Sequence, residues 1–188
     1  LRVWDIVGLD TVAHVAAASY SGLVDDPWRS SFVLPDFYQR MLDEQLLGAK
    51  VNAGFYRKGE AGIEALDLEN FAYQPVQDVD LGPLAAALGE RSPQLRLRAL
   101  WDDASSQGEQ GRAHLLAVLD YAAEHAAEMA GDIAQIDQAM RWGFNWDLGP
   151  FELWDFLGVG EVAKALEAKR QPVPDLVARL LDAGEESF

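Results

Sequence analysis

The 188-residue sequence contains no cysteine and no long apolar run. The absence of cysteine excludes a disulfide framework and any chemistry that needs a thiolate. No stretch approaches the roughly 20 consecutive apolar residues that a membrane-spanning helix needs, and the first residues lack the pattern of a signal peptide. We therefore expect a cytoplasmic protein that does not span a membrane.

Positive charge is also scarce. The sequence has 15 Lys and Arg against 31 Asp and Glu, which gives a net charge of −16. Such a chain repels the phosphate backbone of nucleic acids, and its basic residues occur singly or in pairs rather than in a stripe. We therefore expect no nucleic-acid partner. Hydrophobic residues make up 49% of the sequence, so the composition predicts a packed globular fold.

The sequence does not begin with Met, and residue 1 stands directly before a patterned segment with no cap or turn ahead of it. This beginning is typical of a domain fragment. We therefore expect the chain to be a piece of a longer protein.

Apolar residues recur at helical spacing through most of the chain. The expected helices cover residues 11–22, 35–47, 81–89, 92–103, 109–130 and 136–142, with three short helices between residues 148 and 184. Two short runs around a charged, glycine-rich turn predict a small hairpin at 53–68. Residues 69–80 are expected to be a linker, and residues 104–111 are the best internal break. The predicted fold class is all-α with one small β-hairpin.

The motif WDxxG occurs at residues 4–8 and again at residues 154–158. A shift of 150 residues gives five identities in ten positions there, where chance predicts roughly one in fifteen. A shift of 139 residues then aligns residues 35–43 with residues 174–182. Any two helices broken by glycine look somewhat alike, but helix periodicity does not demand a shared Trp-Asp pair. We therefore expect an internal duplication, with two related helical units packed about a pseudo-twofold axis.

Two stretches carry a family resemblance. The sequence "AMRWGFNWDLGPFELWDFLGV" resembles the signature of the C-terminal domain of 3-hydroxyacyl-CoA dehydrogenases. The segments "DIVGLDTVAHV" and "FVLPDFYQRMLDEQLLGAKVNAGFYRK" resemble the rest of the same domain, which ends in an LGxKxGxGFY element. The resemblance implies a duplicated helical domain of the 6-phosphogluconate dehydrogenase C-terminal type. The first copy would occupy residues 1–58, the hairpin and spacer residues 59–108, and the second copy residues 109–188. Such tandem copies look like those of multifunctional fatty-acid β-oxidation enzymes, where an enoyl-CoA hydratase domain is fused to the same chain.

The resemblance also implies an activity for the longer protein. Such enzymes oxidise 3-hydroxyacyl-CoA to 3-oxoacyl-CoA with NAD, using a His and a Glu on a separate nucleotide-binding domain. This sequence has no GxGxxG turn and no parallel-sheet pattern. We therefore expect no catalytic, cofactor-binding or metal-binding residue in this chain, and no activity from it alone. Its expected partners are the acyl-CoA substrate and the NAD-binding domain, and the tandem copies would replace a homodimer.

The same resemblance suggests where substrate contacts lie. The family has a substrate-contacting Asn near the start of the helical domain. In the second copy Ala113 takes that position and His114 the next, so this copy is expected to be non-catalytic. In the first copy we place Val3, Ile6 and Lys50 near the substrate. Lys50 is a candidate contact for a CoA phosphate, and stabilisation of a helix C-terminus is the alternative.

Other residues are interpreted as structural. Asp5 and Asp155 are expected to cap helices, and Trp142, Trp146 and Trp154 to form an aromatic core cluster. Two alternative functions stay open. In the first, the chain is a non-catalytic dimerisation or docking module. In the second, it is the C-terminal domain of another hydroxyacid dehydrogenase.

Overall fold

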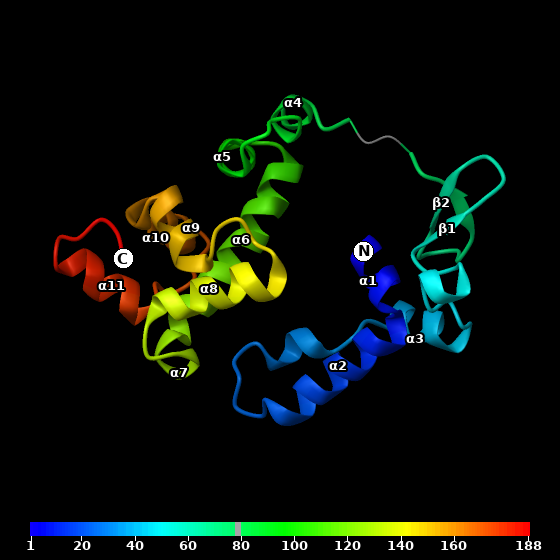
Figure 1. Ribbon diagram of the computed structural model, residues 1–188, viewed down its shortest axis with the longest axis horizontal. Helices are drawn as coiled ribbons and strands as arrows, with labels where there is room; N and C mark the ends of the chain where they lie inside the picture. The colour runs from blue at the N-terminus through cyan, green and yellow to red at the C-terminus, as the bar shows by residue number, and fades with distance from the viewer. Residues whose placement is uncertain (78–79) are drawn as a thin grey trace. The chain divides into compact units, whose positions relative to one another are not determined.

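The computed structural model describes residues 1–77 and 80–188, and the chain divides into two compact units (Figure 1). Unit 1 is Leu1–Val79 and unit 2 is Asp80–Phe188. Of the linker predicted at 69–80, residues 78 and 79 lie outside the described part. Helices predominate in both units, as the sequence predicts, and none of those in the described residues has the length and apolarity needed to cross a bilayer.

Unit 1 combines helices with one small sheet. Its elements are α1 (Arg2–Val7), α2 (Leu9–Gly22), the short 3-10 helix η1 (Arg29–Phe32), α3 (Asp36–Asp43), the 3-10 helix η2 (Ala49–Val51), and strands β1 (Tyr56–Lys58), β2 (Ile63–Leu66) and β3 (Tyr73–Pro75). The core gathers five side chains from these elements: Leu9, Tyr38, Met41, Phe55 and Leu66. Tyr38 also donates a hydrogen bond from its hydroxyl to the Leu9 carbonyl at 2.9 Å. This bond ties α3 to the start of α2, and burial raises the pKa of Tyr38 to about 12.

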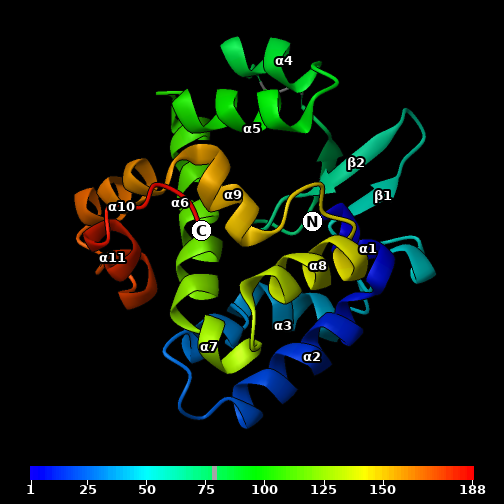
Figure 2. The same ribbon diagram turned by 60° about the vertical axis from the view of Figure 1, so that its left-hand side comes forward.

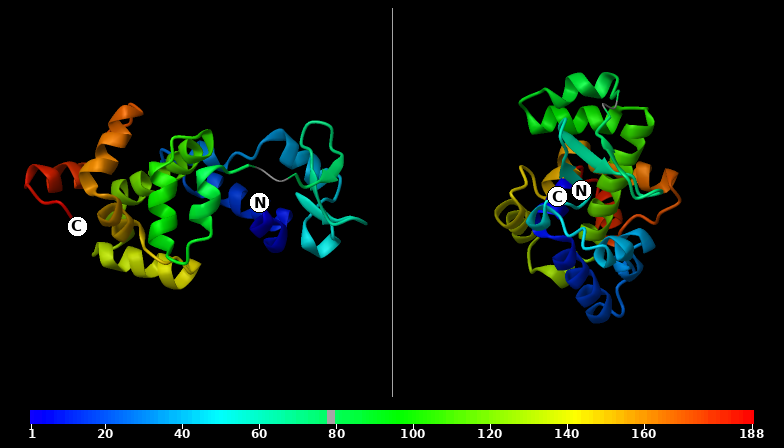
Figure 3. Two further views of the ribbon diagram at one scale, coloured as in Figure 1. Left: turned by 90° about the horizontal axis from the view of Figure 1, so that it is seen from above. Right: turned by 90° about the vertical axis from the view of Figure 1, so that its right-hand side faces the viewer.

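The sheet is larger than the predicted hairpin. Strands β1, β2 and β3 pair antiparallel in chain order, and β3 falls within the predicted linker (Figure 3). The turn before β3 is built by Asp67, whose Oδ1 accepts the backbone N–H groups of Glu69 and Asn70 at 2.9 and 3.2 Å. Because the side chain replaces a backbone turn, no Gly or Pro signal marks this reversal in the sequence.

The secondary-structure elements in the described part of unit 2 are all helices. Its helices are α4 (Pro83–Leu88), α5 (Pro93–Asp102), α6 (Ser106–Glu124), α7 (Ala126–Met129), α8 (Ile133–Phe144), α9 (Pro150–Leu157), α10 (Val159–Ala168) and α11 (Asp175–Asp182). The long helix α6 contacts α5, α9, α10 and α11, so it is the central element (Figure 2). Trp154 of α9 is fully buried against α6 and donates its indole N–H to the Leu119 carbonyl at 3.1 Å.

Two boundaries of α6 differ from the prediction. The helix begins at Ser106, inside the predicted break at 104–111, because Ser105 caps it by accepting the Gly108 N–H. It ends at Glu124 instead of continuing to residue 130, because the chain leaves helical geometry at His125 before α7 begins. Helix α6 therefore runs without a break across the boundary between residues 108 and 109, where the second copy was predicted to start.

Each unit contains the same helix–glycine–helix corner. Gly8 joins α1 to α2 with φ 98° and ψ 126°, and Gly158 joins α9 to α10 with φ 93° and ψ 113°. A side chain is strained at such positive φ, so glycine is needed at both corners. The residue that follows each glycine, Leu9 or Val159, is almost fully buried.

Helices α3 and α11 also end alike. The chain turns through positive φ at Gln45 (59°) and at Gly184 (78°). The next N–H then reaches back to the helix: Leu46 donates to Met41 at 2.8 Å, and Glu185 donates to Leu180 at 3.2 Å. These two bonds are 139 residues apart, the same shift that aligns the two sequences.

Candidate functional site

Asp5 is the organising residue of unit 1. It lies within α1, is 7% exposed, and accepts the backbone N–H groups of Phe55 and Tyr56 at 2.9 and 2.8 Å, one on each carboxylate oxygen. The carboxylate therefore clamps the Gly-Phe-Tyr turn that leads into β1. This bond pair joins residues 50 positions apart in the sequence.

Glycines make that clamp possible. A Cβ on Gly54 would lie 2.2 Å from Asp5 Oδ1, and a Cβ on Gly48 would lie 2.3 Å from the Asp5 carbonyl oxygen. Real Cβ atoms do not approach other atoms this closely, so both positions exclude a side chain. The "LGAKVNAGFY" pattern is therefore explained by the close approach of its backbone to α1.

The expected helix-capping role of Asp5 and Asp155 is wrong. Asp5 is inside α1 and bonds to a distant turn, while Asp155 near the end of α9 accepts the N–H of Phe188 at 2.8 Å. The Phe188 ring packs edge-on against Trp154 with centroids 6.2 Å apart, much as Phe55 packs against Trp4 at 6.4 Å. Both aspartates thus hold the backbone of a phenylalanine whose ring contacts the neighbouring tryptophan, although Trp154 is fully buried and Trp4 is 39% exposed.

Lys50 is held by an acidic neighbour. Its ammonium lies 2.5 Å from both carboxylate oxygens of Asp10 on α2. The hydrogen bond from Lys50 lowers the pKa of Asp10, so the Asp10 carboxylate is charged at neutral pH. The side chain of Lys50 is about half exposed, and the Asp10 carboxylate largely compensates its positive charge.

Val3 and Ile6 lie on the exposed face of α1. They are 68% and 76% exposed, and Val7 on the same face is 51% exposed. In unit 2 the counterparts of Val3 and Val7 on α9, Leu153 and Leu157, are only 7% and 2% exposed, whereas Phe156, the counterpart of Ile6, is 37% exposed. The structure therefore brings Val3 and Ile6 together on one apolar surface and leaves Lys50 on a different element.

Ile6 also borders a concavity with several cations. Its volume is about 320 Å³, and it is lined by Arg2, Asp5 and Ile6 of α1, by Ala49 and Asn52, and by Tyr56, Arg57, Lys58 and Ile63 of the sheet. The sequence analysis missed these basic residues. The pair Arg57-Lys58 follows the Gly-Phe-Tyr turn directly, so its position beside the motif was a usable signal.

The start of α9 is held by a second buried aspartate. Asp137 of α8 is 8% exposed and accepts the N–H groups of Phe151 and Glu152 at 2.8 and 3.1 Å. Glu152 in turn accepts the Gly149 N–H at 2.8 Å and pairs with Arg141 at 2.9 Å. Burial raises the pKa of Asp137 more than these backbone bonds lower it. The "GPFELWD" motif is therefore fixed at its first turn.

The predicted substrate-facing positions of the second copy are exposed. Ala113 and His114 lie on the exposed side of α6, and the methyl group of Ala113 offers no hydrogen bond.

The predicted tryptophan cluster is wrong for one member. Trp154 is buried and Trp146 packs on the same core, but Trp142 is 81% exposed. The described residues contain no group of three or more His, Asp or Glu placed to hold a metal ion.

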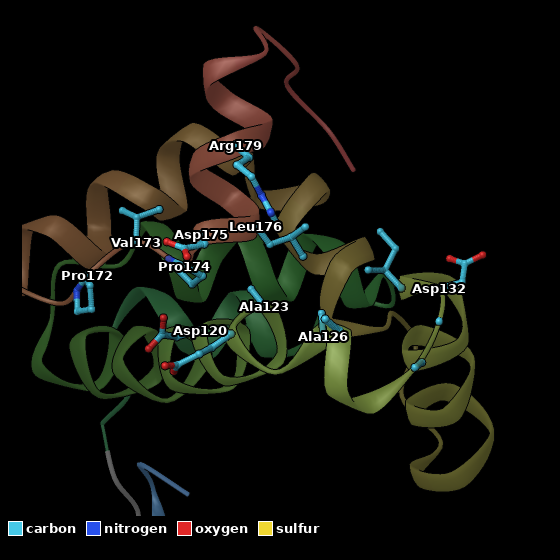
Figure 4. A pocket seen from close by; sticks show the side chains of 15 residues that line it. Asp120, Ala123, Ala126, Asp132, Pro172, Val173, Pro174, Asp175, Leu176 and Arg179 are labelled. Atoms are coloured by element: carbon cyan, nitrogen blue, oxygen red, sulfur yellow. The ribbon is translucent and has the colours of Figure 1, made fainter. Parts of the chain in front are cut away.

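Unit 2 also contains an acid-lined cavity of about 430 Å³ (Figure 4). Asp120 of α6 and Asp175 of α11 lie at one end of it, and Asp132 lies at the other, with alanines of α6 and α7 between them. Asp120 is only 8% exposed, and burial beside Glu124 raises its pKa.

Asp120→Asn is expected to stabilise the chain at pH 7. A raised folded-state pKa means that the folded protein loses stability as pH rises above 3.8, the ordinary pKa of Asp, while below that value the residue is protonated in both states. The variant should therefore gain about 1 kcal/mol at pH 7 and nothing near pH 3, measured by urea unfolding. Asp132→Asn removes the same charge from the exposed end of the cavity and is the control. An equal gain at both pH values would contradict the expectation.

Comparisons with known proteins agree with the motifs. Residues 96–185 match the family described as 3-hydroxyacyl-CoA dehydrogenase, C-terminal domain. A Bacillus subtilis (strain 168) protein named "Probable 3-hydroxyacyl-CoA dehydrogenase" is 36% identical over 187 residues, which cover 100% of this chain and 24% of that protein. A protein of Rickettsia prowazekii (strain Madrid E) whose name reads fatty acid oxidation complex trifunctional enzyme is 23% identical, covering 94% of this chain and 24% of its own length.

The chain thus spans about a quarter of the length of the curated relatives it matches. No solved structure matches it significantly. The matched residues include α6, the Asp137 contact and the "GPFELWD" helix α9. Residues 96–185 of this chain therefore carry the C-terminal domain of the 3-hydroxyacyl-CoA dehydrogenase family.

Proposed function

We propose that this chain is the helical C-terminal region of an NAD-dependent enzyme that oxidises 3-hydroxyacyl-CoA to 3-oxoacyl-CoA in fatty-acid β-oxidation. Its role is to form one wall of the acyl-CoA cleft. The observation that carries the proposal is the 36% identity along the whole chain to the Bacillus subtilis protein named as such a dehydrogenase.

We propose further that the region is duplicated, with the first copy at residues 1–58, a sheet and spacer at 59–108, and the second copy at 109–188. Three shared local geometries support this: the glycine corners at Gly8 and Gly158, the helix ends at Gln45 and Gly184, and the paired aspartate contacts. Backbone geometries that recur in the same order along the chain, with sequence matches at shifts of 150 and 139 residues, are more simply explained by duplication than by chance.

The two copies are proposed to differ in function. Ala113 cannot donate or accept a hydrogen bond through its side chain, so the second copy would have a structural role. In the first copy, Val3 and Ile6 belong to an exposed apolar face. In unit 2 the counterpart of Val3, Leu153, is covered, and that of Ile6, Phe156, is 37% exposed. Exposed apolar faces of this kind mark contacts with other protein or with substrate. This supports the proposal that Val3 and Ile6 lie beside the acyl-CoA substrate.

NAD binding is assigned to the remainder of that protein. The strands in the described residues form one antiparallel sheet, and the sequence has no GxGxxG turn, so the residues present do not fit the nucleotide. A fused enoyl-CoA hydratase domain, a cytoplasmic location and the replacement of a homodimer by the tandem copies are parts of the same proposal. The relatives named as trifunctional fatty acid oxidation enzymes support it.

The test uses the full-length protein and the formation of NADH from 3-hydroxybutyryl-CoA. We expect the full-length protein to be active, the 188-residue chain to be inactive, and deletion of residues 1–79 from the full-length protein to abolish activity. Full activity after that deletion would favour the alternative of a docking module. Oxidation of another hydroxyacid in place of the CoA ester would favour a different dehydrogenase.

A further inference from the structure

The basic residues of unit 1 fall into two groups. The unit has six: Arg2, Arg29, Arg40, Lys50, Arg57 and Lys58. Lys50 pairs with Asp10, Arg40 pairs with Glu44, and Arg29 lies over the Tyr20 ring while donating to the Tyr20 carbonyl. The remaining three, Arg2, Arg57 and Lys58, all line the concavity of about 320 Å³ between α1, η2 and the sheet.

The charges of that concavity are only partly compensated. Arg57 pairs with Glu64 at 2.7 Å, but Arg2 lies over the Tyr56 ring at 5.3 Å and has no carboxylate partner within residues 1–77 and 80–188. Lys58 has no ion pair among the described residues. The acid lining the concavity is Asp5, whose two oxygens are occupied by backbone N–H groups. In a chain of net charge −16, this is a local excess of positive charge.

Apolar surface lies directly beside these cations. Ile6 of α1 is 76% exposed and Ile63 of β2 is 47% exposed, and both line the concavity. Ile63 faces Lys58 across the β1–β2 pairing. A ligand that fits here combines anionic groups with a flat or extended apolar part, because Arg and Lys bind phosphate oxygens and the isoleucines cover apolar surface.

We propose that this concavity binds the phosphorylated adenosine end of the acyl-CoA substrate. The proposal rests on the proposed function, which supplies a substrate with a 3′-phosphate and a diphosphate. Arg2 and Lys58 bind the phosphate oxygens, Arg57 stays paired with Glu64, and Ile6 and Ile63 contact the adenine. Lys50, the phosphate contact expected from the sequence, is excluded from this role because Asp10 already neutralises it.

The binding test uses the 188-residue chain and adenosine 3′,5′-bisphosphate, titrated calorimetrically at low salt. We expect binding that weakens steadily as NaCl is added, because ion pairs with phosphates are screened. Lys58→Ala and Arg2→Ala should each weaken binding at least fivefold. Lys50→Ala is the matched control and should leave the affinity unchanged. Circular dichroism verifies that each variant is folded.

Two results would overturn the proposal. One is the absence of binding at low salt, and the other is an equal loss of affinity in Lys58→Ala and Lys50→Ala. Failure of the site is distinguishable from failure of the proposed function, because the NADH assay on the full-length protein is independent of this titration. Active enzyme whose chain does not bind the bisphosphate overturns the site alone. Binding that adenosine or inorganic phosphate reproduces with equal affinity also overturns it.

Discussion

Asp5→Ala is expected to lower the free energy of unfolding of unit 1 by about 3–5 kcal/mol. The substitution removes both acceptors from the buried N–H groups of Phe55 and Tyr56. Hydrogen bonds to charged groups contribute about 1.5–3 kcal/mol each, and a buried donor left without a partner adds its desolvation cost. Since whole domains are stable by only about 5–15 kcal/mol, a loss of this size should leave unit 1 partly unfolded under mild denaturant.

Hydrogen exchange followed by mass spectrometry measures the effect by region. The amides of residues 53–58 should lose protection in Asp5→Ala, while those of α6 in unit 2 keep theirs. Asp155→Ala is the control, because Asp155 is exposed and accepts a single N–H, from Phe188. Its cost should stay below about 1 kcal/mol. If Asp5→Ala lowered the free energy of unfolding by no more than Asp155→Ala does, the two hydrogen bonds that Asp5 accepts would not be important for the stability of unit 1.

Local patterns predicted most of the fold. Helical periodicity identified α2, α3 and the helices of unit 2, because an apolar stripe is a property of neighbouring residues. The third strand was missed because the turn before it is formed by the side chain of Asp67, and such turns have no strong sequence signal. The end of α6 was missed because alanine-rich sequence continues past His125 with the same period.

The candidate site was less predictable because its contacts join distant residues. Asp5 and Asp155 occupy equivalent places in a repeated motif, and only the structure shows that one of them holds a turn 50 residues away. The pairing of Lys50 with Asp10 crosses 40 residues and is equally invisible to spacing arguments. Trp142 and Trp154 lie in the same aromatic stretch, yet one is 81% exposed and the other is fully buried. Residue type alone does not distinguish them.

The second large effect is expected from Gly149→Ala in unit 2. A Cβ there would lie 2.3 Å from the Cα and 2.4 Å from the Cβ of Asp137. The Asp137 backbone belongs to α8 and its carboxylate holds the first turn of α9, so it cannot move aside without breaking those bonds. We expect a loss of about 3 kcal/mol or more in the free energy of unfolding, measured by urea titration.

Gly160→Ala separates this steric effect from the general effect of replacing glycine. Gly160 lies in α10, and a Cβ there would meet no atom within 4 Å. Because alanine favours helix over glycine by roughly 1 kcal/mol, this variant should be slightly more stable than the parent chain. The two changes add the same methyl group eleven residues apart, so their opposite signs would isolate the contact between Gly149 and Asp137. A small or favourable effect at both positions would mean that α8 and α9 can separate freely and that Asp137 does not fix the "GPFELWD" helix.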